Sequence, residues 1–228
     1  NRRALEEFSR EHSVKRLYDR TGIQVIGFNT IFQLYYLAKH EREQLMQAKT
    51  LLMMPDFFNY LLTGRKKTEY SIASTSQMMD QQTGDWDRAL EELDIPTHML
   101  TEIADSGQPL GYLTDEICEE LGAPKVPVIL TTSHDTGSAV AAVPTTTPDF
   151  AYISSGTWSI MGVEREQPVI NEKSAAYNFA NERGFGRTVR LLKNIMGLWL
   201  IQESRRQWQR EGEDVSFAQL ETEALACK

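Results

Sequence analysis

The stretch from Val126 to Val143 most constrains what this chain can fold into. It begins with the β-branched and apolar residues of a buried strand, turns through small polar residues, and continues with small residues typical of a closely packed helix. In open α/β sheets ligands bind at such turns, because free backbone N–H groups and the helix dipole point outward there. Asp135 lies in this turn beside His134. We expect its carboxylate either to cap the helix or to act as a base.

The composition is that of a globular protein and excludes several function classes. The chain has 228 residues, of which 41% are hydrophobic and 25% charged, enough for one core or two smaller ones. The net charge of −8 argues against nucleic acid as a partner, because phosphate binding needs a basic surface. No apolar run approaches the ~18 residues that span a membrane, and the two cysteines are too few for a disulfide framework or a zinc site.

The two ends of the sequence suggest a piece of a longer protein. The chain begins with Asn1 rather than Met, and nothing follows the helix expected at 217–227 to close it. The first residues are charged and carry no signal peptide, so we expect a cytoplasmic protein.

Several helices are expected from periodicity and from helix start and stop signals. Ile31, Leu34, Tyr35 and Ala38 follow the i, i+3, i+4, i+7 pattern. Pro55 fits the first turn of a further helix, which ends at Gly64. Other helices are expected at 1–18, 41–48, 87–93, 114–122 and 217–227. In contrast, 21–27 is expected to be a turn and short β-like segment, 66–79 an irregular or β-like loop, and 171–185 a loop with patchy helix.

A proline-bracketed run from Pro144 to Asp149 is the clearest linker, because it cannot form a helix interior. We place a domain boundary there, between residues 144 and 145. Strands are expected at 150–154 and 158–163, with Ser155-Gly156-Thr157 as a hairpin tip between them. Such a tip lets backbone N–H groups approach a phosphate closely, although most Ser-Gly-Thr tips are only turns.

Three further residues have two interpretations each. Asn194 is expected to cap a strong helix, on which Gln202 would lie on the same side eight residues later. The pair could line a cleft, or it could be a capping Asn and a solvated Gln. His134 is expected to form hydrogen bonds beside Asp135, because no second histidine lies at metal-ligand spacing, and we expect no metal site in this chain.

Three motifs in this order resemble the carbohydrate kinases of the FGGY family, more narrowly those that act on L-rhamnulose. The motifs are Ser133-His134-Asp135-Thr136, Tyr152 to Ser159, and Asn194 to Trp199. Residues 28–35, 55–64 and 82–87 look like the same group, so that the similarity covers nearly the whole chain. The resemblance implies an α/β fold of two actin-like (ribonuclease H-like) domains, incomplete at both ends. Residues 1–144 would be the C-terminal part of sugar-binding domain I, and 145–228 the N-terminal part of ATP-binding domain II.

The resemblance also implies a role for each motif residue. Asp135 would be the catalytic base, and His134, Thr136 and Asn194 would contact the sugar with it. The nucleotide contacts would be Gly156, Thr157 and Gln202. The implied reaction is ATP-dependent phosphorylation of L-rhamnulose to L-rhamnulose 1-phosphate, with ATP and Mg²⁺ as cofactors. No nucleic acid or membrane partner is implied, and the oligomeric state stays open.

Two parts of the family pattern are missing, and alternatives therefore remain. Nothing before Asn29 resembles the Asp-Gly-Thr phosphate loop, and no glycine-rich adenosine-binding segment follows. We expect the fragment alone to be inactive. The substrate could instead be another ketose or polyol, such as L-fuculose or D-xylulose. A non-catalytic sugar-sensing relative is a further alternative, which the missing loop favours and the intact Asp135 opposes.

Overall fold

The computed structural model describes residues 2–227, which form two compact units. The first consists of Asn1–Tyr152 and Gly162–Lys193, the second of Ile153–Met161 and Asn194–Lys228. No helix within residues 2–227 has both the length and the apolar character needed to cross a membrane.

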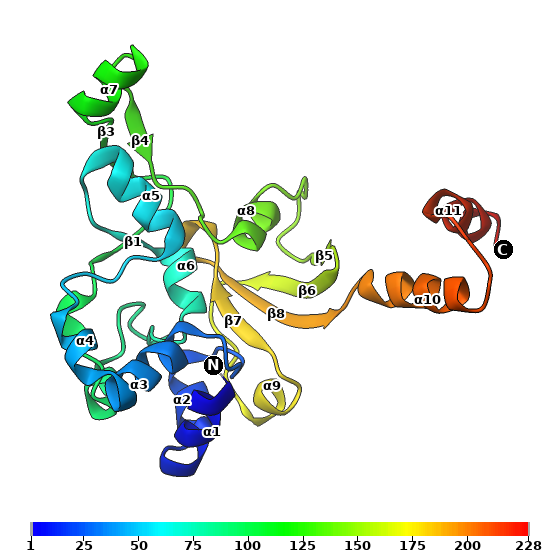
Figure 1. Cartoon of the computed structure of the whole chain (residues 1–228), viewed down its shortest axis with the longest axis horizontal. Coiled ribbons are helices and arrows are strands. Elements are labelled where there is room, and N and C mark those ends of the chain that lie inside the picture. Colours follow the sequence, from blue (N-terminus) through cyan, green and yellow to red (C-terminus); the bar gives the residue numbers. More distant parts are fainter. Residues whose placement is uncertain (1, 228) are drawn as a thin grey trace. The chain divides into compact units, whose positions relative to one another are not determined.

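The first unit has its main hydrophobic core among its N-terminal helices (Figure 1). These are α1 (Arg2–Glu11), α2 (Val14–Thr21), α3 (Thr30–His40) and α4 (Arg42–Gln47). The predicted apolar stripe of α3 is confirmed, since Ile31, Leu34, Tyr35 and Ala38 are all buried. The single helix predicted at 1–18 is instead α1 and α2, because Ser13 caps α2 by accepting a hydrogen bond from Arg16 N at 3.2 Å.

The middle of the first unit follows the predicted capping signals in part. α5 (Met54–Thr63) has Pro55 in its first turn and ends at Gly64, whose φ of 70° is left-handed, as predicted. β1 (Thr68–Glu69) pairs in parallel with β2 (Ile103–Ala104). α6 (Tyr70–Thr75) follows β1 directly. The prediction of an irregular or β-like loop at 66–79 is therefore wrong for these six residues. The described residues 21–27 contain no strand, contrary to the expected β-like segment. The 3₁₀ helices η1 (Arg88–Leu93) and η2 (Thr97–Met99) precede β2.

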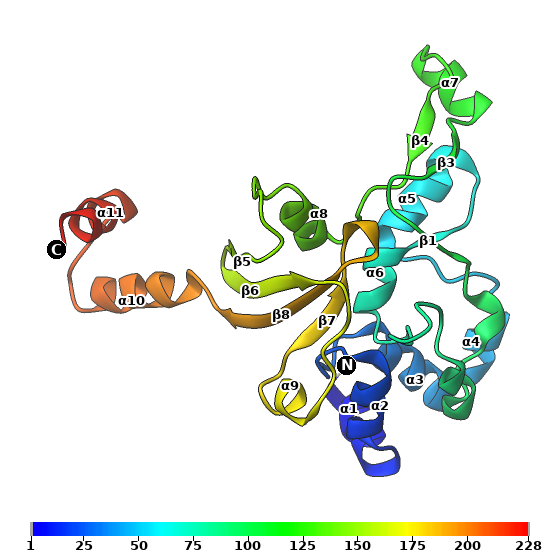
Figure 2. The same ribbon diagram turned by 180° about the vertical axis from the view of Figure 1, so that it is seen from behind.

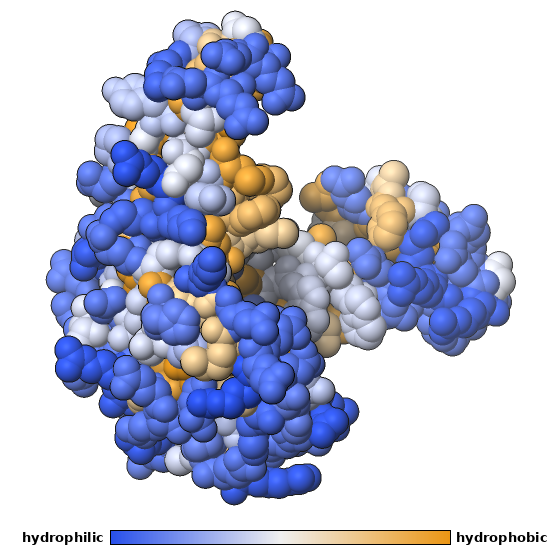
Figure 3. All heavy atoms as spheres, turned by 60° about the vertical axis from the view of Figure 1, so that its left-hand side comes forward, coloured by the Kyte–Doolittle hydropathy of each residue, from blue (hydrophilic) through white to orange (hydrophobic). Residues whose placement is uncertain are grey.

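β3 (Pro109–Tyr112) and β4 (Pro127–Ile129) form an antiparallel pair around α7 (Asp115–Leu121). β4 is the predicted strand, but the expectation that it is buried is wrong, since Val126 and Ile129 are each 43% exposed. The reason is that, among residues 2–227, β4 pairs only with β3, and the helix in contact with it is α5. In Figure 3, apolar side chains gather over this region, where Phe58 and Leu61 of α5 are also exposed.

The remaining sheet has the strand order β5-β6-β8-β7, seen from behind in Figure 2. Its strands are β5 (Ala151–Ser155), β6 (Trp158–Arg165), β7 (Ala180–Arg183) and β8 (Val189–Met196). The predicted hairpin of β5 and β6 is confirmed. β7 and the 3₁₀ helix η3 (Phe185–Arg187) lie where a loop was predicted, after α9 (Glu172–Ala176). β7 pairs with β8, from Ala180 opposite Leu192 to Arg183 opposite Val189, and packs against α6.

The second unit contains α10 (Trp199–Arg210) and α11 (Phe217–Ala226). The prediction that Asn194 caps a helix is wrong, because β8 continues through Asn194 to Met196 and α10 begins at Trp199. Between the two elements, Gly197 packs closely against the tip of the β5–β6 hairpin, since a Cβ atom there would clash with the carbonyl oxygen of Gly156. Asn194 and Gln202 are therefore on a strand and a helix, not on one helix.

Candidate functional site

The turn between β4 and α8 (Asp135–Ala141) carries the predicted catalytic residue. Asp135 is the first residue of α8 and His134 is its N-cap, so the alternative that Asp135 is the helix cap is wrong. The Oδ1 atom of Asp135 accepts a hydrogen bond from Thr136 N at 2.7 Å. Its side chain is 96% exposed. The turn therefore presents a solvent-facing carboxylate that can accept a proton.

Glu69, at the end of β1, lies in the protein interior and anchors this turn through hydrogen bonds. Its side chain is fully buried and accepts hydrogen bonds from Ser133 N and Ser133 Oγ at 3.1 and 2.8 Å. Ser71 Oγ, which donates to Glu69, accepts one from His134 N at 3.1 Å. Burial raises the pKa of the Glu69 carboxyl, but the hydrogen bonds from Ser106, Ser71 and Ser133 outweigh it and hold the pKa below its usual value. The residues before Asp135 are thus tied to an ionised buried group.

The His134 ring lies between Asp135 and a buried ion pair. Its Nδ1 atom is 3.2 Å from Glu182 Oε2 and 2.8 Å from Arg190 Nη2, whereas its Nε2 atom is 3.7 Å from Asp135 Oδ1. Arg190 is fully buried and lies 3.1 Å from Glu182. Although burial raises the pKa of Glu182, its contact with His134 and the charge of Arg190 hold that pKa below its usual value. Glu182 and Arg190 therefore fix the orientation of the ring.

Two residues at the start of α8 face the protein rather than solvent. Thr136 is only 8% exposed, and its hydroxyl lies 3.4 Å from Asp135 Oδ1. Gly137 packs so closely that a Cβ atom would lie 2.6 Å from Thr132 Cγ2 and 3.4 Å from Arg190 Nη2. A larger residue at position 137 would push the start of α8, and with it Asp135, away from this support.

The predicted nucleotide contacts lie in the second unit. Gly156 O accepts a hydrogen bond from Leu198 N at 2.9 Å, and Thr157 O accepts one from Trp199 N at 3.2 Å. The hairpin tip is therefore fastened to the start of α10, and Gln202 follows within the first turns of that helix. Thr157 is exposed, while Gln202 and Asn194 are half-buried.

The structure thus groups His134, Asp135 and Thr136 in the first unit, and Gly156, Thr157, Asn194 and Gln202 in the second. Within residues 2–227, no group of three or more His, Cys, Asp or Glu side chains is placed to hold a metal ion. Sequence reasoning missed Glu69, Ser71, Glu182 and Arg190. β7 lacks the alternation of polar and apolar residues that would have predicted it, because three polar residues follow one another from Asn181 to Arg183.

Family models and curated relatives match almost the whole chain. Residues 2–142 match the N-terminal domain of the FGGY family of carbohydrate kinases, and residues 151–228 match its C-terminal domain. The rhamnulokinase of Bacteroides thetaiotaomicron is 43% identical over 226 residues, which are 99% of this chain and 46% of that protein. The rhamnulokinase of Halalkalibacterium halodurans is 46% identical, over 95% of this chain and 45% of its own length. The chain spans about half the length of these relatives.

Solved sugar-kinase structures share the fold. A xylulose kinase from Rhodospirillum rubrum matches with a TM-score of 0.82 at 19% identity, over 99% of this chain and 46% of that one. A glycerol kinase from Plasmodium falciparum with ADP matches with a TM-score of 0.72 at 17% identity, over 88% and 42%. At these identities the likeness concerns the fold alone. The predicted α/β sugar-kinase fold is confirmed.

Proposed function

The chain belongs to the FGGY family of carbohydrate kinases, and on that premise we propose that the protein transfers the γ-phosphoryl group of ATP to L-rhamnulose. The product is L-rhamnulose 1-phosphate. The identity of 40–46% to four bacterial rhamnulokinases supports this choice of sugar.

The observation that carries the proposal is the exposed carboxylate of Asp135 on an otherwise anchored turn. Phosphoryl transfer to an alcohol asks for alignment and charge stabilisation more than for covalent chemistry by the protein. Asp135 accepts the proton of the sugar hydroxyl as the new O–P bond forms and the bond to the β-phosphate oxygen breaks.

The remaining predicted residues receive the following roles in the proposal. His134, Thr136 and Asn194 contact the sugar, with the Glu182–Arg190 pair orienting the His134 ring. Gly156 and Thr157 contact the nucleotide phosphates at the hairpin tip, and Gln202 contacts the nucleotide from α10. Residues 1–144 form the sugar-binding domain, and residues 145–228 form the ATP-binding domain, which also supplies Asn194 to the sugar.

Magnesium fits this chemistry as the partner of ATP. Mg²⁺ usually keeps several waters and is held by substrate phosphates with one or two carboxylates, so a dedicated cluster of protein ligands is not required. When bound with ATP, Mg²⁺ would supply positive charge against the phosphate oxygens.

A coupled ADP-release assay of the full-length protein tests the proposal. L-rhamnulose, L-fuculose, D-xylulose and glycerol are compared at several concentrations each. We expect the highest kcat/KM with L-rhamnulose. A higher value with L-fuculose or D-xylulose would assign a different ketose to the same chemistry, whereas ADP release that no sugar stimulates would favour a sugar-sensing relative without kinase activity.

A further inference from the structure

Glu69 is a buried carboxylate with an unusually complete set of hydrogen-bond donors. Its Oε1 atom accepts from Ser71 N at 2.9 Å and from Ser106 Oγ. Its Oε2 atom accepts from Ser71 Oγ, from Ile72 N at 3.2 Å, and from both the N and Oγ atoms of Ser133. Each donor faces an oxygen, so the arrangement suits an ionised carboxylate, which only accepts hydrogen bonds.

These contacts join two segments that are distant in the sequence. Glu69 and Ser71 belong to the start of α6, whereas Ser133 and His134 form the turn that leads to Asp135. The backbone N–H of Ser133 donates a hydrogen bond to Glu69 itself. The backbone N–H of His134 donates one to Ser71 Oγ, which in turn donates to Glu69. Both residues before Asp135 are therefore held by Glu69, one directly and one through a single hydroxyl.

The Asp135 side chain has little support of its own. Its carboxylate is 96% exposed and is held by Thr136, the next residue in the chain, through N–H at 2.7 Å. The direction of the carboxylate consequently depends on the backbone of the turn. Misplacing a reacting group by about 1 Å can lower a rate by about a hundredfold.

We propose that Glu69 is a positioning residue for phosphoryl transfer, which fixes the backbone of the Ser133–Asp135 turn so that the Asp135 carboxylate meets the sugar hydroxyl. This inference rests on the proposed function of Asp135. Glu69 makes no contact with substrate in the proposal and acts through the turn alone.

Glu69→Gln is the direct test, because an amide NH₂ group in place of one oxygen faces N–H and O–H donors. In the full-length protein we expect kcat with the best sugar to fall about 10- to 100-fold, with KM for ATP within about threefold of wild type. Amide hydrogen exchange over residues 131–136 should speed up as the turn loosens. Asp56→Asn is the matched control, because Asp56 Oδ1 accepts a hydrogen bond from Glu69 N at 3.0 Å but contributes none to the turn. It should leave kcat and the exchange of the turn near wild type.

A double mutant separates positioning from general stability. If Glu69 acts through Asp135, Glu69→Gln combined with Asp135→Asn should be no more than about twofold slower than Asp135→Asn alone. The proposal would be contradicted if the fold-losses in kcat of the two single variants multiplied in full in the double variant. A folded Glu69→Gln protein with wild-type kcat would also contradict it.

Smaller changes keep the test decisive if Glu69→Gln does not fold. Ser71→Ala removes the acceptor of His134 N–H, and Ser133→Ala removes one of the two bonds from Ser133 to Glu69. Each should lower kcat about 3- to 10-fold and speed up exchange in the turn. If amide exchange in the turn is faster in these variants but the wild-type protein phosphorylates no sugar, the proposed function is refuted. The anchoring of the turn by Glu69 would still stand. Unchanged exchange in these variants would overturn the anchoring itself.

Discussion

The Nδ1 atom of His134 lies 3.2 Å from Oε2 of Glu182, while its Nε2 atom lies 3.7 Å from Oδ1 of Asp135. One ring thus connects an exposed carboxylate with a buried one. Because the side chain of His134 is only 20% exposed and Arg190 also contacts Nδ1, the ring has little freedom to turn. If His134 contacts the sugar, Glu182 on β7 and Arg190 on β8 should affect the affinity for the sugar through the orientation of the ring.

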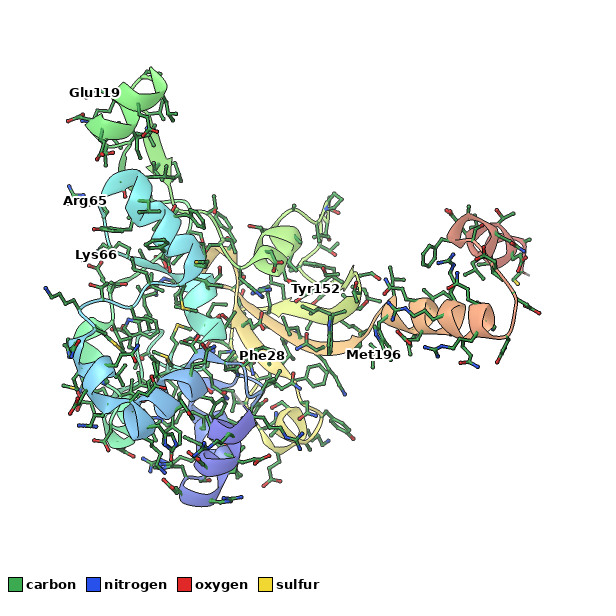
Figure 4. The ribbon with its side chains drawn as sticks, viewed as in Figure 1. Phe28, Arg65, Lys66, Glu119, Tyr152 and Met196 are labelled. Atoms are coloured by element: carbon green, nitrogen blue, oxygen red, sulfur yellow. The ribbon has the colours of Figure 1, made fainter. Side chains whose placement is uncertain are left out.

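Glu182→Gln should therefore weaken sugar binding. The amide keeps the size of the side chain but removes the negative charge that faces His134 and Arg190. We expect KM for the sugar to rise about tenfold and KM for ATP to stay within about twofold, because the ionic contacts of Glu182 with His134 and Arg190 that orient the ring are lost. Initial rates at varied sugar and varied ATP check this. Glu119→Gln, on the exposed surface of α7 (labelled in Figure 4), is the control and should change neither value. Equal effects on both KM values would contradict a specific role at His134.

Asp56 should make the stability of the protein depend on pH. Burial, followed by the charge of the neighbouring Glu69, raises the pKa of Asp56 to about 7. In the unfolded chain this proton is lost near 3.8, the ordinary pKa of an aspartate. The contribution of Asp56 to stability is thus fully present below about pH 4 and is lost as pH rises toward 7, by about 1.4 kcal/mol per unit at most. Asp56→Asn removes the titrating group. Denaturant unfolding at pH 5 and pH 8 should show the variant gaining stability relative to wild type at the higher pH; a constant difference would contradict the assignment.

Gly162→Ala should destabilise the sheet. Tyr152 extends from β5 across β6 (Figure 4), and a Cβ atom at position 162 would lie 2.6 Å from its hydroxyl and 2.9 Å from Leu191 O. Overpacking of this kind costs about 1–3 kcal/mol, which a lower thermal unfolding midpoint would report. Tyr152→Phe is the matched partner, because the buried hydroxyl has no hydrogen-bond partner among the described residues. Alone it should be near neutral, and combined with Gly162→Ala it should recover part of the loss. No recovery would place the strain at Leu191 instead.

Gly137→Ala should lower activity by moving the start of α8. The added methyl group would lie 2.6 Å from Thr132 Cγ2, and Thr132 is itself buried. We expect kcat to fall about tenfold or more, since the displaced segment carries Asp135. Thr132→Ser deletes the obstructing methyl group and keeps the hydroxyl, which donates to Ser106 at 3.2 Å. The double variant should therefore regain most of the activity. An inactive double variant would show that Arg190, 3.4 Å from the same Cβ position, is the limiting contact.

Local signals explain the elements that the sequence predicted correctly. Pro55 and Gly64 bound α5, and Thr114 and Gly122 bound α7, because each acts through its own backbone conformation or a hydrogen bond within one turn. The hairpin of β5 and β6 is local for the same reason.

Pairing between distant segments explains what the sequence could not predict. Asn194 has the side chain of a helix cap, but strand pairing carries β8 past it to Met196. Glu69 and Ser133 are 64 residues apart, and nothing in either segment alone indicates that they meet. The Asp135 and hairpin-tip motifs were recognisable as motifs, whereas the buried residues that hold His134 and Asp135 emerge only from the fold.

The rate of Asp135→Asn in the full-length protein tests the central claim most directly. Its control is Asp115→Asn, which changes an exposed aspartate at the corresponding first position of α7. With saturating ATP and the best sugar, loss of a general base should lower kcat at least about a hundredfold in Asp135→Asn and leave Asp115→Asn unchanged. A wild-type rate in Asp135→Asn would show that this carboxylate does not take the proton, and would contradict the account of the turn as a catalytic site.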